Sequence, residues 1–211
     1  MKLTRFQDVV SSEEELRAIL GYPNRVVANK AISYLDHHCR DFIAQSPLLL
    51  MATADASGAC DVSPRGDGPG LALILDQQHL VIPERPGNRR MDSLRNILEN
   101  PQIGLIFLIP GLEETLRVNG RASIIKDQQL LKQMEYRGHV PALGIGVQVE
   151  ECYVHCAKAL KRSQLWNPEA WPDQDTLPDV ARMMADHANL PDVTAKEVAE
   201  SLKETYTKRL Y

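Results

Sequence analysis

The sequence predicts a mainly β fold, an antiparallel β-barrel with helices outside it. From about residue 48 onward, apolar residues stop following helical spacing and begin to alternate with polar ones, which is the period of a strand. Short turn segments separate consecutive apolar runs, which indicates hairpins and therefore antiparallel pairing. About seven strands are predicted in this way, and sheets of about that size tend to close or fold over.

The N-terminal part, about residues 1–45, is predicted to be helical. Ser12 and Glu15 have the spacing of a capping box at the start of a helix. Residues 25–46 are predicted to continue as one helix, in which His38 lies near the apolar stripe and is expected to be half-buried. The stripe consists of Ala28, Ala31, Leu35, Cys39 and Phe42.

The predicted strands follow one another with short connections. Turns at Ala56-Ser57 and at Asp76-Gln77-Gln78 each join two strands into a hairpin. Residues 103–109 are continuously apolar, so this strand is predicted to be buried on both faces. The strands are predicted at 48–55, 58–64, 71–75, 79–83, 103–109, 115–125 and 144–156.

The remaining helices are predicted around this sheet. One is inserted between residues 83 and 103; it is expected to begin at Arg90 with Asn88 as its N-cap and to end at Asn100-Pro101. A short helix over 127–137 precedes the last strand, residues 162–179 form an ordered loop, and a terminal helix covers 194–210. We therefore expect a single domain over residues 1–211, ending in a loop plus helix over about 163–211.

Composition excludes some classes of function. With 211 residues, 44% hydrophobic and 25% charged, the chain is an ordinary globular sequence, and its net charge of −4 argues against a general nucleic-acid surface. No apolar run approaches the roughly 20 residues of a membrane span. The N-terminal residues lack the apolar core of a signal peptide, so a cytoplasmic protein with reduced cysteines is expected.

Cysteine and histidine residues near the end of the last strand invite a metal site, but strand geometry argues against it. Cys152 and Cys156 would share a face about 13 Å apart, and His155 would point the other way. One zinc ion needs its ligands around a single tetrahedron. No metal is therefore expected, and Cys39 and Cys60 are expected to be small core residues.

An arginine pair marks a candidate anion site. Arg89 and Arg90 fall in the predicted first turn of the inserted helix, where the helix dipole disfavours cations. The free N–H groups of that turn bind anions, and Ser93 can bring a hydroxyl to the same point. Guanidinium forks and N–H groups together suit a phosphate monoester, whereas the alternative is two solvated side chains.

Two further segments carry candidate binding residues. Ser63, Arg65 and Asp67 alternate on one face if their strand persists, and glycines at 66, 68 and 70 allow close approach of a ligand. In the late segment "KALKRSQLW" a set of residues falls at helical spacing, which indicates either a solvated basic turn with a packed Trp or a contact to phosphate or an aromatic ring. These residues are Lys158, Arg162 and Trp166, with Lys161 as an additional cation.

The order of "VSPRGD", a hairpin, "PGNRRMDSLRNILENPQIGLIFLIPG", an alternating strand and "KALKRSQLW" resembles a known family. It is similar to the FMN-binding split β-barrels related to pyridoxamine 5′-phosphate oxidase, and more closely to a branch of FMN-dependent enzymes. The similarity covers about residues 25–170. It implies an α+β split barrel with peripheral helices and a homodimer that holds two FMN molecules at the subunit interface.

The resemblance also implies roles for residues. Arg89, Arg90 and Ser93 match the segment that grips the FMN phosphate, and Ser63 and Arg65 match the strand beside the flavin ring. The late segment with Lys158, Arg162 and Trp166 matches the part that completes the flavin site, from the same or the other subunit. The Arg-x-His element with which true pyridoxamine phosphate oxidases bind substrate is missing, so that vitamin substrate is not expected.

These features favour an FMN-dependent oxidoreductase that acts on a small molecule. In such a flavoprotein the cofactor carries the chemistry, which agrees with the lack of a convincing catalytic triad. Two alternatives stay open at this point: a non-catalytic flavin-binding or sensor protein, and a split-barrel protein that binds haem or a deazaflavin. The fold by itself does not decide among them.

Overall fold

The computed structural model of the protein describes residues 5–211. The chain forms two compact units, one that ends at Ala31 and one that covers Ile32–Tyr211. None of the helices in the described part is long and apolar enough to cross a lipid bilayer.

The first unit contains two short helices, α1 (Glu13–Leu20) and α2 (Arg25–Asn29), and neither buries a side chain. At the start of α1, the hydroxyl of Ser12 accepts a hydrogen bond from the backbone N–H of Glu15 at 3.2 Å, as the capping spacing predicts. The prediction of one helix over 25–46 is wrong, because α2 ends at Asn29 and the next helix begins only at His37.

That next helix, α3 (His37–Gln45), has its own N-cap. The carboxylate of Asp36 accepts a hydrogen bond from the backbone N–H of Cys39 at 2.8 Å. Just before this cap, Ile32 exchanges backbone hydrogen bonds with Cys152 of the last strand, at 3.0 and 2.7 Å. This strand-like pairing occupies the backbone groups that a continuous helix would need, which explains the break.

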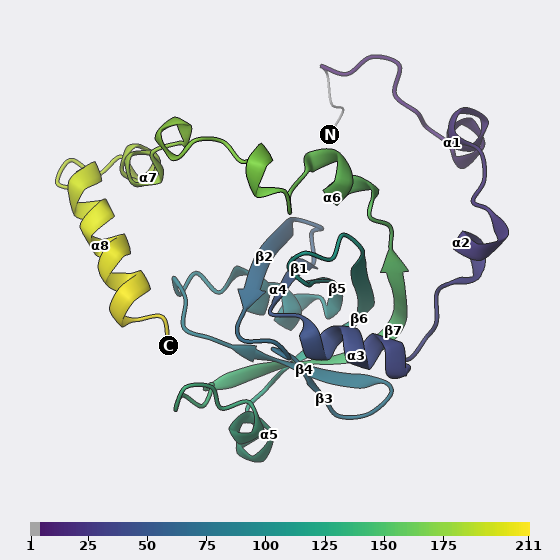
Figure 1. The fold of residues 1–211 in the computed structure, drawn as a ribbon, viewed down its shortest axis with the longest axis horizontal. Coiled ribbons are helices and arrows are strands. Elements are labelled where there is room, and N and C mark those ends of the chain that lie inside the picture. Colours follow the sequence, from purple (N-terminus) through teal and green to yellow (C-terminus); the bar gives the residue numbers. More distant parts are fainter. Residues whose placement is uncertain (1–4) are drawn as a thin grey trace. The chain divides into compact units, whose positions relative to one another are not determined.

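Seven antiparallel strands form one sheet in the second unit, in the order β2-β1-β5-β6-β7-β4-β3. The sheet curls into a barrel that is not closed, because β2 and β3 lie at its two edges (Figure 1). This confirms the predicted mainly antiparallel, split-barrel α+β fold with peripheral helices. The strands are β1 (Leu48–Ala54), β2 (Cys60–Gly66), β3 (Leu73–Ile74), β4 (His79–Glu84), β5 (Gln102–Leu108), β6 (Thr115–Ile125) and β7 (Leu143–His155).

The core fills the inside of this open barrel. Every second side chain of β1, β5 and β6 points inward. These side chains pack against α3 and the helix α4 (Asp92–Glu99). Burial of each such side chain contributes about 1.5–3 kcal/mol, so the alternation fixes which face of each strand turns inward. The largest fully buried side chains here are Leu35, Ile43, Leu49, Met51, Leu80, Ile82, Leu105, Phe107, Leu116 and Ile145.

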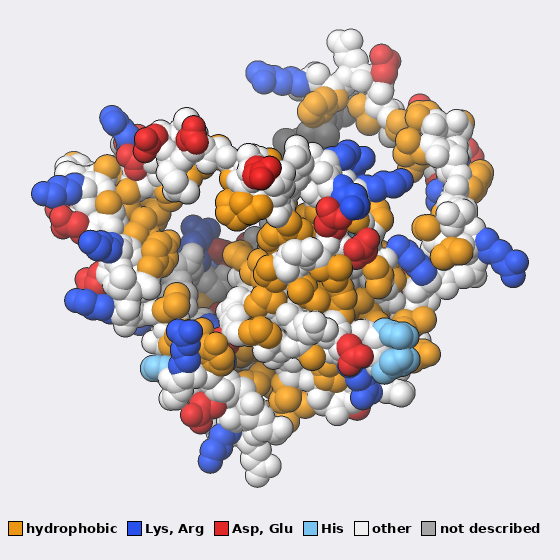
Figure 2. Space-filling model, in the orientation of Figure 1, with side chains coloured by type: hydrophobic (Ala, Val, Ile, Leu, Met, Phe, Trp, Pro, Cys, Tyr) orange, Lys and Arg blue, Asp and Glu red, His pale blue; other side chains and the backbone are white. Residues whose placement is uncertain are grey.

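The outer face of β1, β2 and β5 is apolar and exposed. Leu50 is 36% exposed and pairs with Ile106 of β5, while Val62 of β2 is 63% exposed. Residues 103–109 were expected to be buried on both faces, but Gly104 and Ile106 are only half-buried. Figure 2 shows hydrophobic side chains gathered over these strands at the centre of the view.

A bulge in the longest pair of strands requires a glycine. The register of β6 against β7 shifts between Asn119 and Gly120. A Cβ atom at Gly120 would overlap the backbone carbonyl oxygen of Gln148. Only glycine therefore lets the two strands approach at this point.

The remaining helices lie outside the sheet. The short helix α5 (Gln128–Gln133) packs Leu131 on Val81 of β4, and α6 (Lys158–Ser163) follows β7. Two 3₁₀ turns, Pro168–Ala170 and Gln174–Thr176, order the loop that the sequence predicted there. The terminal helix α8 (Ala195–Lys208) is confirmed and packs on α7 (Val180–Ala188), which the sequence did not predict.

Candidate functional site

A cavity of about 1130 Å³ opens beside the edge strand β2. Its walls come from β2, the end of β4, the loop between β4 and α4, the start of α4, the turn after α5, and residues 210–211. All of these belong to the second unit. Large clefts with a few convergent polar groups are where proteins bind cofactors and substrates.

The loop before α4 forms one end of the cavity, and it differs from the sequence prediction. The helix begins at Asp92 with Met91 as its N-cap, not at Arg90 with Asn88. The Asn88 side chain instead accepts a hydrogen bond from the backbone N–H of Arg90 at 3.0 Å, within the loop. Arg89 and Arg90 therefore precede the helix, and an acidic residue takes the first-turn position that the dipole favours.

This loop is nevertheless built like an anion site. Arg89 and Met91 have left-handed backbones, with φ of 63° and 60°, which is rare for residues other than glycine. Such conformations cost about 1–3 kcal/mol each and cluster at functional sites. Among the residues that the structure describes, no side chain caps the first turn of α4, so its N–H groups have no acceptor from a capping side chain.

The two arginines differ in what they contact. The Nε of Arg90 lies 2.8 Å from an Asp92 carboxylate oxygen, and this hydrogen bond raises the pKa of Arg90. Arg89 makes no ion pair among the residues that the structure describes. The guanidinium of Arg89 is therefore the more available of the two for an anion in the cavity.

A chain of hydrogen bonds links β2 to α4. The Nε of Arg65 donates to the Ser63 hydroxyl at 3.3 Å, and that hydroxyl lies 3.0 Å from the hydroxyl of Ser93. Ser93 in turn donates to the carboxylate of Asp61 at 2.6 Å. Because the hydroxyl proton of Ser93 points to Asp61, Ser63 is the donor of the middle bond. The guanidinium of Arg65 also pairs with Glu84, so its position is fixed from two sides.

A second cluster lines the other end of the same cavity. Asp67 accepts hydrogen bonds from Arg85 at 2.6 Å and from the phenol of Tyr211 at 3.0 Å. Gly68 was expected to let a ligand approach the backbone, but a Cβ there would lie 2.8 Å from the phenol oxygen of Tyr136. The glycine therefore makes room for a tyrosine of this chain.

The late segment lies elsewhere. Lys158 and Arg162 belong to α6, and Trp166 donates from its indole N–H to the backbone oxygen of Leu112 at 3.0 Å. None of the three lines the cavity within one chain, and Lys161 pairs with Glu113. Of the predicted site residues, the structure thus brings together Ser63, Arg65, Arg89, Arg90 and Ser93, and leaves Lys158, Arg162 and Trp166 apart from them.

Several cavity residues escaped the sequence prediction. Asp61 alternates with Ser63 and Arg65 along β2, so the period of the strand could have identified it. Glu84 ends the buried strand β4 and Arg85 follows it directly, which is a weaker signal. Nothing in the sequence places Tyr211 beside Asp67, because 144 residues separate them.

The cysteines divide into a buried pair and two exposed thiols. Cys152 donates to Cys39 with the sulfur atoms 3.3 Å apart, and this bond together with burial raises the pKa of Cys152. The hydrogen bond from Cys152 lowers the pKa of Cys39. Cys60 was expected in the core, but it is exposed because it lies on the outer face of an edge strand, and Cys156 is exposed beyond the end of β7.

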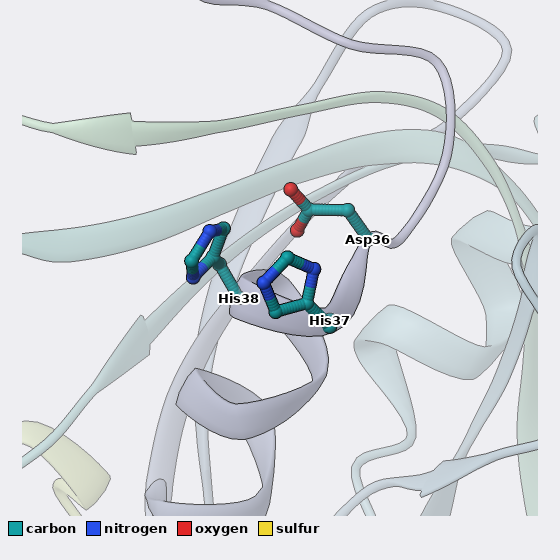
Figure 3. A group of neighbouring side chains, drawn as sticks. All are labelled: Asp36, His37 and His38. Atoms are coloured by element: carbon teal, nitrogen blue, oxygen red, sulfur yellow. The ribbon is translucent and has the colours of Figure 1, made fainter.

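Three other side chains with metal-ligating atoms meet at the start of α3. The ligand atoms of Asp36, His37 and His38 lie within 4.8 Å of one another (Figure 3). Asp36 already caps the helix, and the hydrogen bond from Cys39 lowers its pKa. His38 was expected to be half-buried, but both histidines are exposed. This group does not line the cavity.

Comparison with known families now identifies the fold. A family model described as pyridoxamine 5′-phosphate oxidase matches residues 35–156. The chain belongs to the pyridoxamine 5′-phosphate oxidase family. The resemblance seen in the sequence is thereby confirmed. The matched range includes every strand, the loop before α4 and the hydrogen-bond chain, and it ends before Lys158 and Tyr211.

Solved structures resemble this member of the pyridoxamine 5′-phosphate oxidase family at low identity. HupZ of Group A Streptococcus is 20% identical over 56% of this chain and 92% of its own, with a TM-score of 0.46. HutZ of Vibrio cholerae, described as a heme storage protein, is 19% identical over 57% and 93%, with a TM-score of 0.41. An F420 reductase is 17% identical over 55% and 94%, with a TM-score of 0.39. Among curated proteins, none matches the chain.

Proposed function

We propose that the protein is an FMN-dependent oxidoreductase that acts on a small molecule. The observation that carries this proposal is the end of the cavity at α4. There Arg89, which has no ion pair among the described residues, lies beside a helix start whose N–H groups lack a side-chain cap. A phosphate monoester such as that of FMN suits both kinds of donor.

The residues around the cavity fit the cofactor as follows. Arg89 and the first turn of α4 hold the phosphate, and Arg90 donates the guanidinium N–H groups that its pair with Asp92 leaves available. The Ser93 hydroxyl donates its hydrogen bond to Asp61 and so does not donate to the phosphate. Its hydrogen bonds with Ser63 and Asp61 hold the start of α4 against β2. A phosphate oxygen can still approach the backbone N–H of Ser93.

Arg65 is the residue that acts on the ring. Ser63 and Glu84 hold its guanidinium in one place, and its side chain is only 16% exposed. A fixed charge in a partly buried site needs no reorganisation when charge develops nearby, which is the condition for electrostatic stabilisation. Bound FMN supplies transfer of a hydride or an electron pair. The role of Arg65 is to orient the ring and to donate to it the guanidinium N–H groups that Ser63 and Glu84 leave available.

We further propose a homodimer with the flavin site shared between subunits. The apolar face around Leu50, Val62 and Ile106 is exposed to solvent in the single chain, and apolar patches of this kind mark protein interfaces (Figure 2). A second copy related by two-fold symmetry is the commonest solution. Lys158, Arg162 and Trp166 do not reach the cavity of their own chain, so the partner is the proposed source of these groups.

A cytoplasmic location belongs to the same proposal. All four cysteines are free, including the buried pair Cys39 and Cys152, whose sulfur atoms share a hydrogen bond and no disulfide. Reduced thiols are the rule in the cytoplasm.

The cofactor is tested by denaturing protein purified without added flavin and identifying the released molecule by mass and absorption spectrum. We expect FMN at about one equivalent per chain. Release of haem or a deazaflavin instead would overturn the FMN assignment. Turnover with a reduced nicotinamide donor then separates an oxidoreductase from a protein that only binds flavin.

The shared site is tested with a charge on the apolar face. We expect Val62→Asp to give a monomer that retains little FMN, because the charge cannot be buried against a second copy. Val180→Asp is the matched control: this valine is 56% exposed on α7, outside the face, and its replacement should leave the assembly unchanged. A monomeric Val62→Asp protein with a full equivalent of FMN would contradict the shared site.

A further inference from the structure

The side chain of Tyr211 is held in the cavity wall like a bound ligand. It lies beyond the end of α8, which packs on α7, and Leu210 beside it remains 54% exposed. The contacts that bring Tyr211 to the barrel come from the residues directly after β2 and β4 and from the turn after α5, all of which line the cavity. One polar group accepts a hydrogen bond from the Tyr211 hydroxyl, and several other groups surround the Tyr211 ring.

The polar group is a buried carboxylate. The side chain of Asp67 is only 4% exposed, and its Oδ2 pairs with the Nε of Arg85 at 2.6 Å. Its Oδ1 accepts from the backbone N–H of Gly68 and from the hydroxyl of Tyr211, both at 3.0 Å. The other nitrogens of Arg85 donate to backbone carbonyls, which fixes the pair in place. Asp67 is therefore a preorganised acceptor for one hydroxyl group.

The ring lies among cations and other rings. The guanidinium carbons of Arg85 and Arg137 are 5.9 and 5.6 Å from its centre, within the range of cation–π attraction. The rings of Tyr136 and His139 lie 5.5 and 6.0 Å away. Arg137 occupies a tight turn with φ of 50°, a position that favours Asn or Gly, so the turn carries strain to place this arginine.

We propose that this cluster is a binding subsite for a hydroxyaromatic ring, and that Tyr211 fills it as an internal ligand. Asp67 recognises the hydroxyl, and Arg85, Arg137 and the neighbouring rings recognise the aromatic face. When Tyr211 leaves, little apolar surface of its own segment becomes newly exposed, so exchange with a free ligand is feasible. The inference rests on the proposed function, in which such a ring enters the cavity that holds FMN and is the substrate class of the enzyme.

The test uses p-cresol, which is the tyrosine side chain as a free molecule, and toluene, which lacks the hydroxyl. Both are titrated by calorimetry into wild-type protein, Tyr211→Ala and Tyr206→Ala, without flavin. We expect Tyr211→Ala to bind p-cresol at least tenfold more tightly than it binds toluene, and at least tenfold more tightly than wild type binds p-cresol. Tyr206, which is 63% exposed on α8 and does not line this cavity, is the control and should behave as wild type.

Two double variants assign the contacts. In the Tyr211→Ala background, Asp67→Asn should remove the preference for p-cresol over toluene. Arg137→Asn suits the turn backbone, so it should keep the fold and weaken both ligands alike. Equal binding of p-cresol and toluene by Tyr211→Ala, or equal binding of p-cresol by this variant and wild type, would overturn the subsite. Because no flavin is present, failure here leaves FMN binding intact, and a failure to find FMN leaves the p-cresol result intact.

Discussion

Removal of the Arg89 guanidinium should weaken FMN and spare riboflavin. Arg89→Ala keeps a Cβ at the left-handed position, so the backbone strain of the loop stays the same and only the charge is lost. A hydrogen bond to a charged group contributes about 1.5–3 kcal/mol. Arg89 is exposed, and solvent screening places the expected loss near the lower end, roughly a tenfold increase in Kd.

The assay is a titration of flavin into flavin-free protein, followed by quenching of flavin fluorescence. Riboflavin lacks the phosphate and should bind wild type and Arg89→Ala alike. Arg90→Ala should cost less than Arg89→Ala, because Arg90 is already paired with Asp92. Arg121→Ala, an exposed arginine on β6 that does not line the cavity, is the control. If Arg89→Ala weakened riboflavin as much as FMN, or had no effect on either, the phosphate site would not be at this loop.

Three further outcomes follow from the structure. Gly120→Ala should lower the free energy of unfolding by about 3 kcal/mol or more in urea denaturation, because the added Cβ would overlap the Gln148 carbonyl oxygen. Gly66→Ala is the control and should change the free energy of unfolding little, because a Cβ there would lie 3.7 Å from its nearest neighbours. Burial and the hydrogen bond to Asp67 raise the pKa of Tyr211, so the docking of its side chain contributes stability at neutral pH that is lost as the pH rises through this raised pKa. An ultraviolet titration should show one phenol that ionises later than the others and that is missing in Tyr211→Phe. An identical titration of the two proteins would refute the contact. A thiol reagent should modify the two exposed cysteines rapidly and the buried pair only after denaturation, and rapid modification of all four would contradict the burial.

The sequence alone determined the parts of this protein that depend on neighbours along the chain. Alternation along 115–125 identified β6 and its buried face, because a strand turns every second residue the same way. Turn residues located the hairpin between β1 and β2, and a capping pattern located α1. The motif order around the inserted helix was long enough to indicate the family.

Tertiary structure decided which distant segments meet, and these contacts changed the local structure that the sequence predicted. The helix predicted over 25–46 is broken because Ile32 pairs with Cys152, a contact 120 residues away that no local pattern encodes. The outward face of β5 remains half-exposed because burial depends on what packs against a strand as well as on its own apolar residues.

The site shows the same division. An arginine pair before a helix could be read from the sequence, since charge near a helix start has a local electrostatic meaning. The partners of these residues could not be read: Asp92 neutralises Arg90, and Asp61 accepts the hydrogen bond of the Ser93 hydroxyl. The contact between Asp67 and Tyr211 has no sequence signal at all, because a hydrogen bond between remote side chains needs only a donor and an acceptor, which most polar residues offer. Only the folding of the sheet, which brings β2, β4 and residues 210–211 around one cavity, selects this pair from the many that the sequence permits.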